Sequence, residues 1–379
     1  MADRTVVTQP HPLLSVADNG YTRWNTPEHR RAGFRSIRDI GRYGITLRAP
    51  RVRLLPKDII HTLGDVPAVQ RMTGSTMFCA LVVLQDGAIA YEKYAADFAP
   101  HQLHTIMSIT KTTMTLAVGK LVEQGKIDLA QPVGAYLPEV GSGYASATVQ
   151  QVLDMNVVND YIEDYSDPAC SAFDSEVTFG WRLPADGGRE QTIREYLCTI
   201  QSDDVTNYSG EMLYKSANTD ILGWIVERQS GRSLRDWYRE IAEAAGIEHS
   251  MYVSTDREFV PLASGGISLS ARDLARYGAL FLTGGVGVNG EQVGSAAFLD
   301  ATRANPGTHR PDGYRYSNQT VTNGRWLAHG GYGGQWMMAD PDTQVVVAFF
   351  SVMENRSASD AQYGTDRITL AEDIVAHLR

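Results

Sequence analysis

Residues 108–124 read SITKTTMTLAVGKLVEQ, and apolar residues occupy most sides of this stretch when it is wound as a helix. Such a segment predicts a buried helix, because a surface helix carries a single apolar stripe. Gly125 follows at a position where glycine commonly ends a helix. We therefore expect this helix to lie inside the protein, with the rest of the chain packed around it.

Strand-like segments lie on both sides of this helix in the sequence. Residues 77–84 and 88–94 flank the pair Asp86-Gly87, a pattern typical of a β-hairpin. Two more strand-like runs lie around residues 326–338 and 344–352. Further helices are predicted at residues 149–155, 193–200, 221–229, 271–282 and 368–378. This order predicts an α+β fold in which both ends of the chain build one sheet, with a helical insertion between them.

The same pattern predicts the domain boundaries. Residues 1–70 are weakly periodic and are expected to form an arm packed on the body. Residues 71–125 and 260–379 are expected to form the sheet domain. Residues 126–259 are expected to form the helical domain, which contains a long polar loop at 156–189.

Composition excludes several classes of function. The 379 residues carry a net charge of −10, which argues against a nucleic-acid partner. No apolar run approaches the roughly 18–20 residues needed to span a bilayer, so we expect no membrane partner. The three cysteines and scattered histidines show no metal-ligand spacing, and no nucleotide motif stands in a strand–helix context, so we expect no metal and no cofactor. The first residues show no leader pattern, which predicts a cytoplasmic protein, although a leader removed earlier stays open.

The strongest chemical signal is Ser108-Ile109-Thr110-Lys111, which holds one of six lysines in the chain. Serine is a weak nucleophile until a base removes its proton. Positions i and i+3 of a helix share a face, with Cβ atoms about 5–6 Å apart, so Lys111 can reach the Ser108 hydroxyl. Lysine acts as a base in its neutral form, which burial favours. The pattern predicts a serine nucleophile with a lysine base. The alternative is a serine helix cap beside a solvated lysine.

Two later stretches add to this signal. Tyr214 precedes a predicted helix, and a phenol between Lys111 and Lys215 could relay a proton. The sequence HGGYGGQ at 329–335 runs into a strand, where glycines let the backbone pass close to a substrate. Each stretch alone has an ordinary structural interpretation: a surface tyrosine before a helix cap, and a glycine-rich bend.

Together the three motifs resemble the serine β-lactamase and penicillin-binding-protein superfamily, in its class C and esterase branch, over roughly residues 75–375. The resemblance implies an α/β sandwich with an antiparallel sheet flanked by helices. It also implies that Ser108 is acylated, that Lys111 and Tyr214 are its base and proton relay, and that the N–H groups of Ser108 and Tyr332 form the oxyanion hole. His329 and Gly331 match the family's third motif.

Within that superfamily the chain is similar to the amidases that cleave 6-aminohexanoate oligomers, in stretches at 152–155, 163–168, 180–182 and 216–220. This likeness implies that Tyr165 bonds the scissile amide, Trp181 closes over the substrate, Glu176 favours a substrate ammonium, and Ser264 lines the pocket. Glu176 replaces a shorter aspartate and Tyr332 an aliphatic residue, and both differences bear on the substrate.

The sequence therefore predicts a serine hydrolase for small linear amides or esters, with a small molecule as its partner and a homodimer left open. A carboxylesterase or acyltransferase without amidase activity is the main alternative. A β-lactamase or D-aminopeptidase is less favoured, because those enzymes prefer lysine at the position of His329 to hold a substrate carboxylate. A catalytically silent binding protein is disfavoured by the joint presence of Ser108, Lys111 and Tyr214.

Overall fold

The computed structural model describes residues 24–165, 167, 170–184 and 188–379. The first part of the predicted arm and Ser166 and Pro168 of the predicted loop lie outside the described residues. In the described part, eight strands form an antiparallel sheet in the order β3-β2-β12-β11-β10-β9-β8-β7. The strands are β2 (Phe78–Gln85), β3 (Ala88–Tyr94), β7 (Thr308–His309), β8 (Arg315–Ser317), β9 (Thr320–Thr322), β10 (Leu327–Gly330), β11 (Trp336–Asp340) and β12 (Val345–Ser351).

The predicted α+β fold is confirmed, and both ends of the chain supply the sheet. β2 and β3 form the predicted hairpin, and β2 pairs on its other edge with β12 from the C-terminal part. Asp86 and Gly87 in the turn have φ angles of 50° and 80°, and positive φ at both positions suits the tightest hairpin turns. Asp and Gly suit these two positions because both tolerate positive φ better than most residues.

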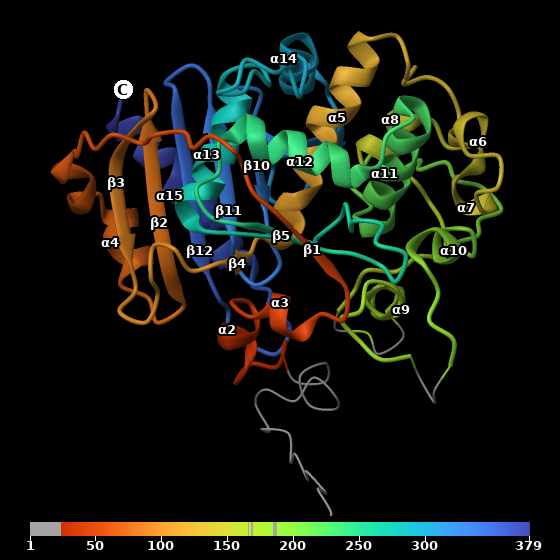
Figure 1. Ribbon diagram of the computed structural model, residues 1–379, viewed down its shortest axis with the longest axis horizontal. Coiled ribbons are helices and arrows are strands. Elements are labelled where there is room, and N and C mark those ends of the chain that lie inside the picture. The colour runs from red at the N-terminus through yellow and green to blue at the C-terminus, as the bar shows by residue number, and fades with distance from the viewer. Residues whose placement is uncertain (1–23, 166, 168–169, 185–187) are drawn as a thin grey trace, which may run out of the picture.

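Helices cover both faces of this sheet, as Figure 1 shows. In β12, Val346, Ala348 and Phe350 join one hydrophobic core, and the alternate residues of the strand join another. This alternation follows from side chains that point to opposite faces of a strand. α13 (Ala271–Leu282) packs on the first face, and α4 (Pro67–Thr73) with α15 (Ala361–His377) packs on the second. The arrangement is the predicted sandwich.

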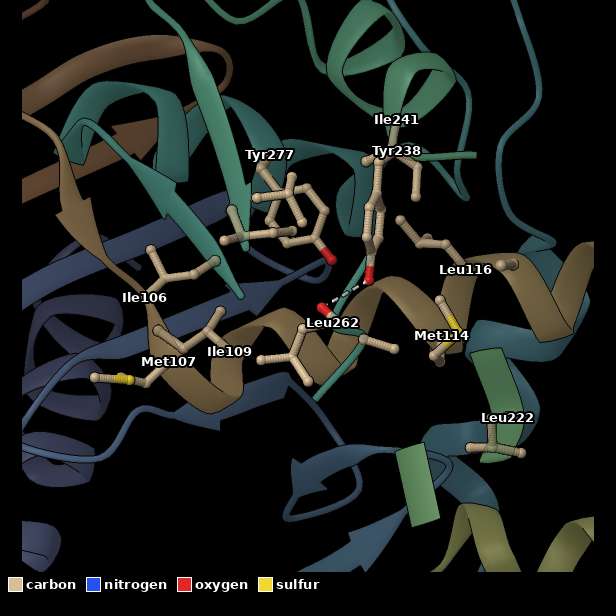
Figure 2. Close-up of a cluster of buried hydrophobic side chains, with 14 of the residues drawn as sticks. Ile106, Met107, Ile109, Met114, Leu116, Leu222, Tyr238, Ile241, Leu262 and Tyr277 are labelled. Carbon is tan, nitrogen blue, oxygen red and sulfur yellow. Dashed lines mark hydrogen bonds between the residues drawn. The ribbon is translucent and has the colours of Figure 1, made fainter. Parts of the chain in front are cut away.

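The helical region lies beside the sheet and surrounds α5 (Thr112–Glu123). Figure 2 shows Leu222, Tyr238, Ile241 and Tyr277, from three different helices, gathered around α5. The described residues of this region form α6 (Val133–Tyr136), α7 (Ser142–Ala145), α8 (Val149–Leu153), α9 (Ser171–Thr178), α10 (Ile193–Leu197), α11 (Ser216–Ser230) and α12 (Leu234–Ala245). α14 (Ala296–Ala304) also packs on α5. The helix predicted to be buried is therefore enclosed by others.

A second, four-stranded sheet was not predicted. Its order is β1-β5-β6-β4, with β1 (Gly44–Leu47), β4 (His104–Thr105), β5 (Met251–Ser254) and β6 (Ile267–Leu269). The arm thus contributes a strand as well as the short helices α2 (Arg30–Gly33), α3 (Ile37–Ile40) and η1 (His61–Asp65). β4 leads directly into η2 (Met107–Lys111), a 3₁₀ turn that precedes α5.

Several predicted boundaries differ from the structure. The helix predicted at 221–229 is α11, which begins five residues earlier at Ser216, and the helices predicted at 149–155 and 193–200 end earlier, at Leu153 and Leu197. The helix predicted from residue 108 begins with the 3₁₀ turn, and its α-helical part begins at Thr112. The single strand-like run at 326–338 is two strands, β10 and β11, because the glycines at 330–334 form a turn between them. The last helix starts at Ala361, where the Asp360 side chain accepts a hydrogen bond from the Tyr363 N–H and caps it. None of the helices that the described residues form has the length and apolar character needed to cross a bilayer.

Candidate active site

Ser108 lies in the 3₁₀ turn between β4 and α5. The preceding residue, Met107, has a φ of 48°, in the left-handed region that a non-glycine residue seldom adopts. Such a conformation costs of order 1–3 kcal/mol and persists where the surrounding structure holds it. Here the Ile106 N–H donates to the Ile267 carbonyl at 2.9 Å on the neighbouring strand. The strained turn places Ser108 on the walls of two cavities.

Lys111 is fully buried beneath Ser108. Its Nζ lies 2.9 Å from Ser108 Oγ, 2.9 Å from Ser216 Oγ and 2.7 Å from the Ser264 carbonyl oxygen. In a 3₁₀ turn the side chains at i and i+3 eclipse one another, which brings Lys111 onto Ser108. The predicted contact between the two side chains is present. A single nitrogen therefore has three oxygen neighbours, one of which is the candidate nucleophile.

Tyr214 stands beside this lysine, with Lys111 Nζ 4.9 Å from the centre of its ring. Burial raises the pKa of the Tyr214 phenol, and the charge of Lys111 opposes that shift. The expectation that Lys215 would flank the tyrosine is wrong. The Lys215 Nζ instead donates hydrogen bonds to the carbonyls of Asn159 and Tyr161, and its burial lowers its pKa to about 8. Tyr214 therefore has one lysine neighbour, the one that also reaches Ser108.

The turn after β10 holds Tyr332, the second of the two expected oxyanion donors beside Ser108. Gly331 must be glycine, because a Cβ there would lie 2.4 Å from Gln335 Oε1 and 2.6 Å from the Ile106 carbonyl oxygen. Its N–H donates to the Gln335 carbonyl at 2.9 Å. Within the described residues, the N–H groups of Ser108 and Tyr332 have no hydrogen-bond acceptor, and both residues line the same cavities. Two unused backbone donors at one site can stabilise a developing oxyanion.

His329, at the end of β10, is a neutral imidazole. Its Nδ1 lies 2.7 Å from the Gly330 carbonyl oxygen, which can only accept, so Nδ1 carries the hydrogen. Its Nε2 lies 3.1 Å from the Tyr316 hydroxyl, which is left to donate. Burial lowers the pKa of His329 to about 3, and the charge of Lys111 contributes. The residue lines the wider cavity but brings no positive charge to it.

Two cavities meet at Ser108, Tyr165 and Tyr332. The wider one, about 590 Å³, is also lined by Tyr214, His329 and Gly331. The narrow one, about 40 Å³, is lined by three of the predicted substrate residues, Glu176, Trp181 and Ser264. The structure therefore places every predicted site residue on one or both of these walls, except Lys111, which lies beneath them.

Aromatic side chains form part of the wall of the narrow cavity. Tyr165 and Tyr332 have ring centres 4.9 Å apart, and Trp181 packs edge-on against Phe179 at 4.8 Å. The indole N–H of Trp181 donates to Ser254 Oγ at 2.9 Å, which fixes the ring. These tilted and edge-on rings offer apolar surface to the part of a substrate that reaches this cavity.

Glu176 reaches the narrow cavity but is already paired. Its carboxylate forms an ion pair with Arg182, whose guanidinium also lies 4.2 Å from the Phe173 ring centre. Burial raises the pKa of Glu176, and Arg182 opposes the shift. A substrate ammonium would therefore compete with Arg182 for the carboxylate of Glu176, a competition that the sequence did not indicate.

Sequence reasoning missed several residues of this site. Glu163 accepts hydrogen bonds from the Ser216 hydroxyl at 2.8 Å and from the Ser216 N–H. Asp220 accepts from the Ala263 N–H, the Ser264 N–H and the Ser264 hydroxyl at 2.9–3.1 Å. Trp24 of the arm lines the narrow cavity. The first two lie in stretches quoted for the family likeness, which is the signal that could have found them. The arm offers no such signal.

Known proteins similar to this chain are consistent with the family that its motifs resemble. A family model described as Beta-lactamase matches residues 68–372. The 6-aminohexanoate-dimer hydrolase of Paenarthrobacter ureafaciens is 34% identical over 287 residues, which are 75% of this chain and 72% of that protein.

Two solved structures share the fold. A Bacillus anthracis protein, described as a candidate 6-aminohexanoate-dimer hydrolase, has a TM-score of 0.79 at 22% identity, over 94% of this chain and 96% of that one. EstCE1, described as a hydrolase with promiscuous acyltransferase activity, has a TM-score of 0.59 at 16% identity, over 83% of this chain and 99% of that one. At these identities the two structures show the fold alone.

Proposed function

The chain belongs to the beta-lactamase family and is a hydrolase of the serine β-lactamase superfamily, and from that premise we propose that Ser108 cleaves small linear amides or esters through an acyl-enzyme. The observation that carries the proposal is the position of Lys111 Nζ, 2.9 Å from Ser108 Oγ and sealed from solvent. A nucleophile and a base within hydrogen-bond reach are what covalent catalysis by serine requires.

In the proposed reaction, Lys111 takes the Ser108 proton as Oγ bonds to the substrate carbonyl carbon. The negative charge that forms on the carbonyl oxygen is held by the N–H groups of Ser108 and Tyr332. Tyr214, beside Lys111, relays the proton to the leaving nitrogen or oxygen, and the acyl group stays on Ser108. A water molecule then gives a proton to Lys111 as its oxygen bonds to the acyl carbonyl carbon. The bond from that carbon to Ser108 Oγ breaks, Oγ takes the proton back from Lys111, and the acid is released.

The cavities support an orientation for the substrate. Tyr214 lines the wider cavity and not the narrow one, so the leaving group that it protonates departs into the wider cavity. The acyl part then occupies the narrow cavity, with Tyr165 at the junction beside the scissile bond. The aromatic rings that line this cavity suit the apolar part of a linear acyl chain.

The choice of amides or esters over β-lactams rests on the relative at 34% identity and on His329, which supplies no charge at the family's third motif; the cations that line the wider cavity, Arg310 and Arg367, come from other positions. Recognition of a carboxylate next to the scissile bond calls for a cation. His329 is neutral, as its hydrogen bonds and its lowered pKa both indicate. The name of the relative at 34% identity supports a linear amide, and 6-aminohexanoate dimer is the first substrate to test.

The test is a substrate panel with two variants. We expect turnover of 6-aminohexanoate dimer or of p-nitrophenyl esters of linear acids, and little turnover of a β-lactam. Ser108→Ala should abolish turnover at an unchanged melting temperature, and Tyr214→Phe should lower kcat by roughly 10²–10⁴, the range for a lost acid–base group. Turnover by Ser108→Ala above a tenth of the original rate would reject the proposal, and a preference for β-lactams would reject the substrate class.

A further inference from the structure

The geometry points to Glu163 as a positioning residue for this reaction: its carboxylate turns the Ser216 hydroxyl hydrogen away from Lys111, so that a neutral Lys111 presents its lone pair to Ser108. The inference rests on the proposed acyl-enzyme function and adds a residue to it.

Glu163 uses both carboxylate oxygens on one neighbour. One oxygen accepts the Ser216 N–H, and the other accepts the Ser216 hydroxyl at 2.8 Å. An ionised carboxylate has no hydrogen to give, so the hydroxyl hydrogen must lie on the Glu163 side. The lone pairs of Ser216 Oγ are then left to face Lys111 Nζ, 2.9 Å away.

The directions of the two hydrogens of a neutral Lys111 follow from its oxygen neighbours. The Ser264 carbonyl oxygen, 2.7 Å from Lys111 Nζ, can only accept. Its position is set by Asp220, which accepts from the Ser264 N–H at 3.1 Å and from the Ser264 hydroxyl at 2.9 Å. A neutral amine has two hydrogens, and these two acceptors use both. The lone pair is thereby aimed at Ser108 Oγ, the third neighbour, whose hydrogen it can take.

The charge on Glu163 favours the same step. Lys215, and Lys111 once it carries a proton, face this carboxylate as cations and oppose the rise that burial imposes on the pKa of Glu163. When the Ser108 proton moves to Lys111, the new ammonium lies one hydroxyl away from the carboxylate. Glu163 therefore both fixes the direction of transfer and stabilises the charge that the transfer creates.

The experiment measures acylation before steady state, with a p-nitrophenyl ester, from pH 5 to 10 in four proteins: the original, Glu163→Gln, Ser216→Ala and the double variant. We expect Glu163→Gln to lower the acylation plateau by about 100-fold, the cost of a small misplacement of reacting groups. The midpoint of its pH–rate profile should move to lower pH, because a carboxylate no longer favours the ammonium form. The double variant should be only slightly slower than Ser216→Ala, because most of the effect of Glu163 on the rate passes through that hydroxyl.

Glu227→Gln is the matched control, a half-buried glutamate on α11 that pairs with Arg194 away from the site. It should leave acylation unchanged and combine additively with Ser216→Ala. Additive losses for Glu163→Gln and Ser216→Ala, or an unmoved pH midpoint, would overturn the inference. If Glu163→Gln does not fold, Ser216→Ala alone carries the test, and an unchanged profile in that variant would also overturn it.

The two proposals fail differently. Absence of an acyl adduct on Ser108 in the original protein would remove the proposed function. An adduct that forms equally fast in Glu163→Gln would leave the function standing and remove only the role of Glu163.

Discussion

Arg182→Met should give this enzyme a preference for substrates with a terminal ammonium. Glu176 is buried in the narrow cavity, with 6% of its side chain exposed, and its charge is occupied by Arg182, whose side chain is 38% exposed. A substrate ammonium must displace that guanidinium before it can pair with Glu176. Methionine keeps an apolar stem near Phe173 and removes the competing charge.

The size of the effect follows from the pair. A hydrogen bond to a charged partner contributes about 1.5–3 kcal/mol, and 1.4 kcal/mol is a factor of ten in binding or rate. Because Glu176 is buried and Arg182 partly exposed, we take the lower end and expect about a 10-fold gain. The gain should increase with pH. Burial raises the pKa of Glu176, and loss of Arg182 removes a charge that opposes this rise, so a higher pH is needed to ionise the carboxyl that pairs with the substrate ammonium.

The assay compares two amides that differ in one group, 6-aminohexanoate dimer and N-hexanoyl-6-aminohexanoate. The quantity measured is the ratio of their kcat/KM values. Arg182→Met should raise this ratio about 10-fold, and Glu176→Gln in the same background should abolish the rise. Equal changes in kcat/KM for both amides would refute the reasoning, because the arginine would then shape the pocket without competing for the charge.

Three further outcomes are expected. Lys111→Arg should slow acylation about as much as Lys111→Met, roughly 10²–10⁴-fold at pH 7 and at pH 9, since arginine stays protonated; a near-normal rate in the arginine variant would make Lys111 an electrostatic anchor. Tyr165→Phe should lower kcat/KM for amides roughly 10-fold and spare p-nitrophenyl esters, and equal losses on both would contradict its bond to the amide. Burial lowers the pKa of His104 to about 3, whereas the value in the unfolded chain is about 6.5. As the pH falls below 6.5, the unfolded chain binds a proton at His104 that the folded protein does not bind, so the free energy of unfolding decreases. Denaturant titrations should show that this loss, about 2–3 kcal/mol between pH 6.5 and 4.5, is smaller in His104→Phe, and parallel curves would contradict it.

The sequence predicted those elements of the fold whose pattern lies within one continuous segment of the chain. The hairpin has its turn residues between two apolar runs, and α5 is a long continuous segment. The second sheet has no such signal, because β4 and β6 are two and three residues long and meet from far apart in the chain. Short strands gain their stability from tertiary pairing, and a periodicity cannot develop over two residues.

The candidate site divides in the same way. Ser108 and Lys111 lie three residues apart, so their contact follows from helix geometry. The direction of Lys215 depends on the carbonyls of Asn159 and Tyr161, and sequence adjacency to Tyr214 gave the wrong neighbour. Glu163 meets Ser216 across more than fifty residues, a contact that spacing cannot predict.

Ser108 is expected to carry an acyl group during turnover, and intact-mass spectrometry detects such an adduct. The protein is mixed with a p-nitrophenyl ester of a linear acid and quenched in acid within milliseconds to seconds. We expect a mass gain equal to the acyl group, located on the peptide that contains Ser108 and absent in Ser108→Ala. Turnover without any adduct, or an equal adduct in Ser108→Ala, would contradict the account.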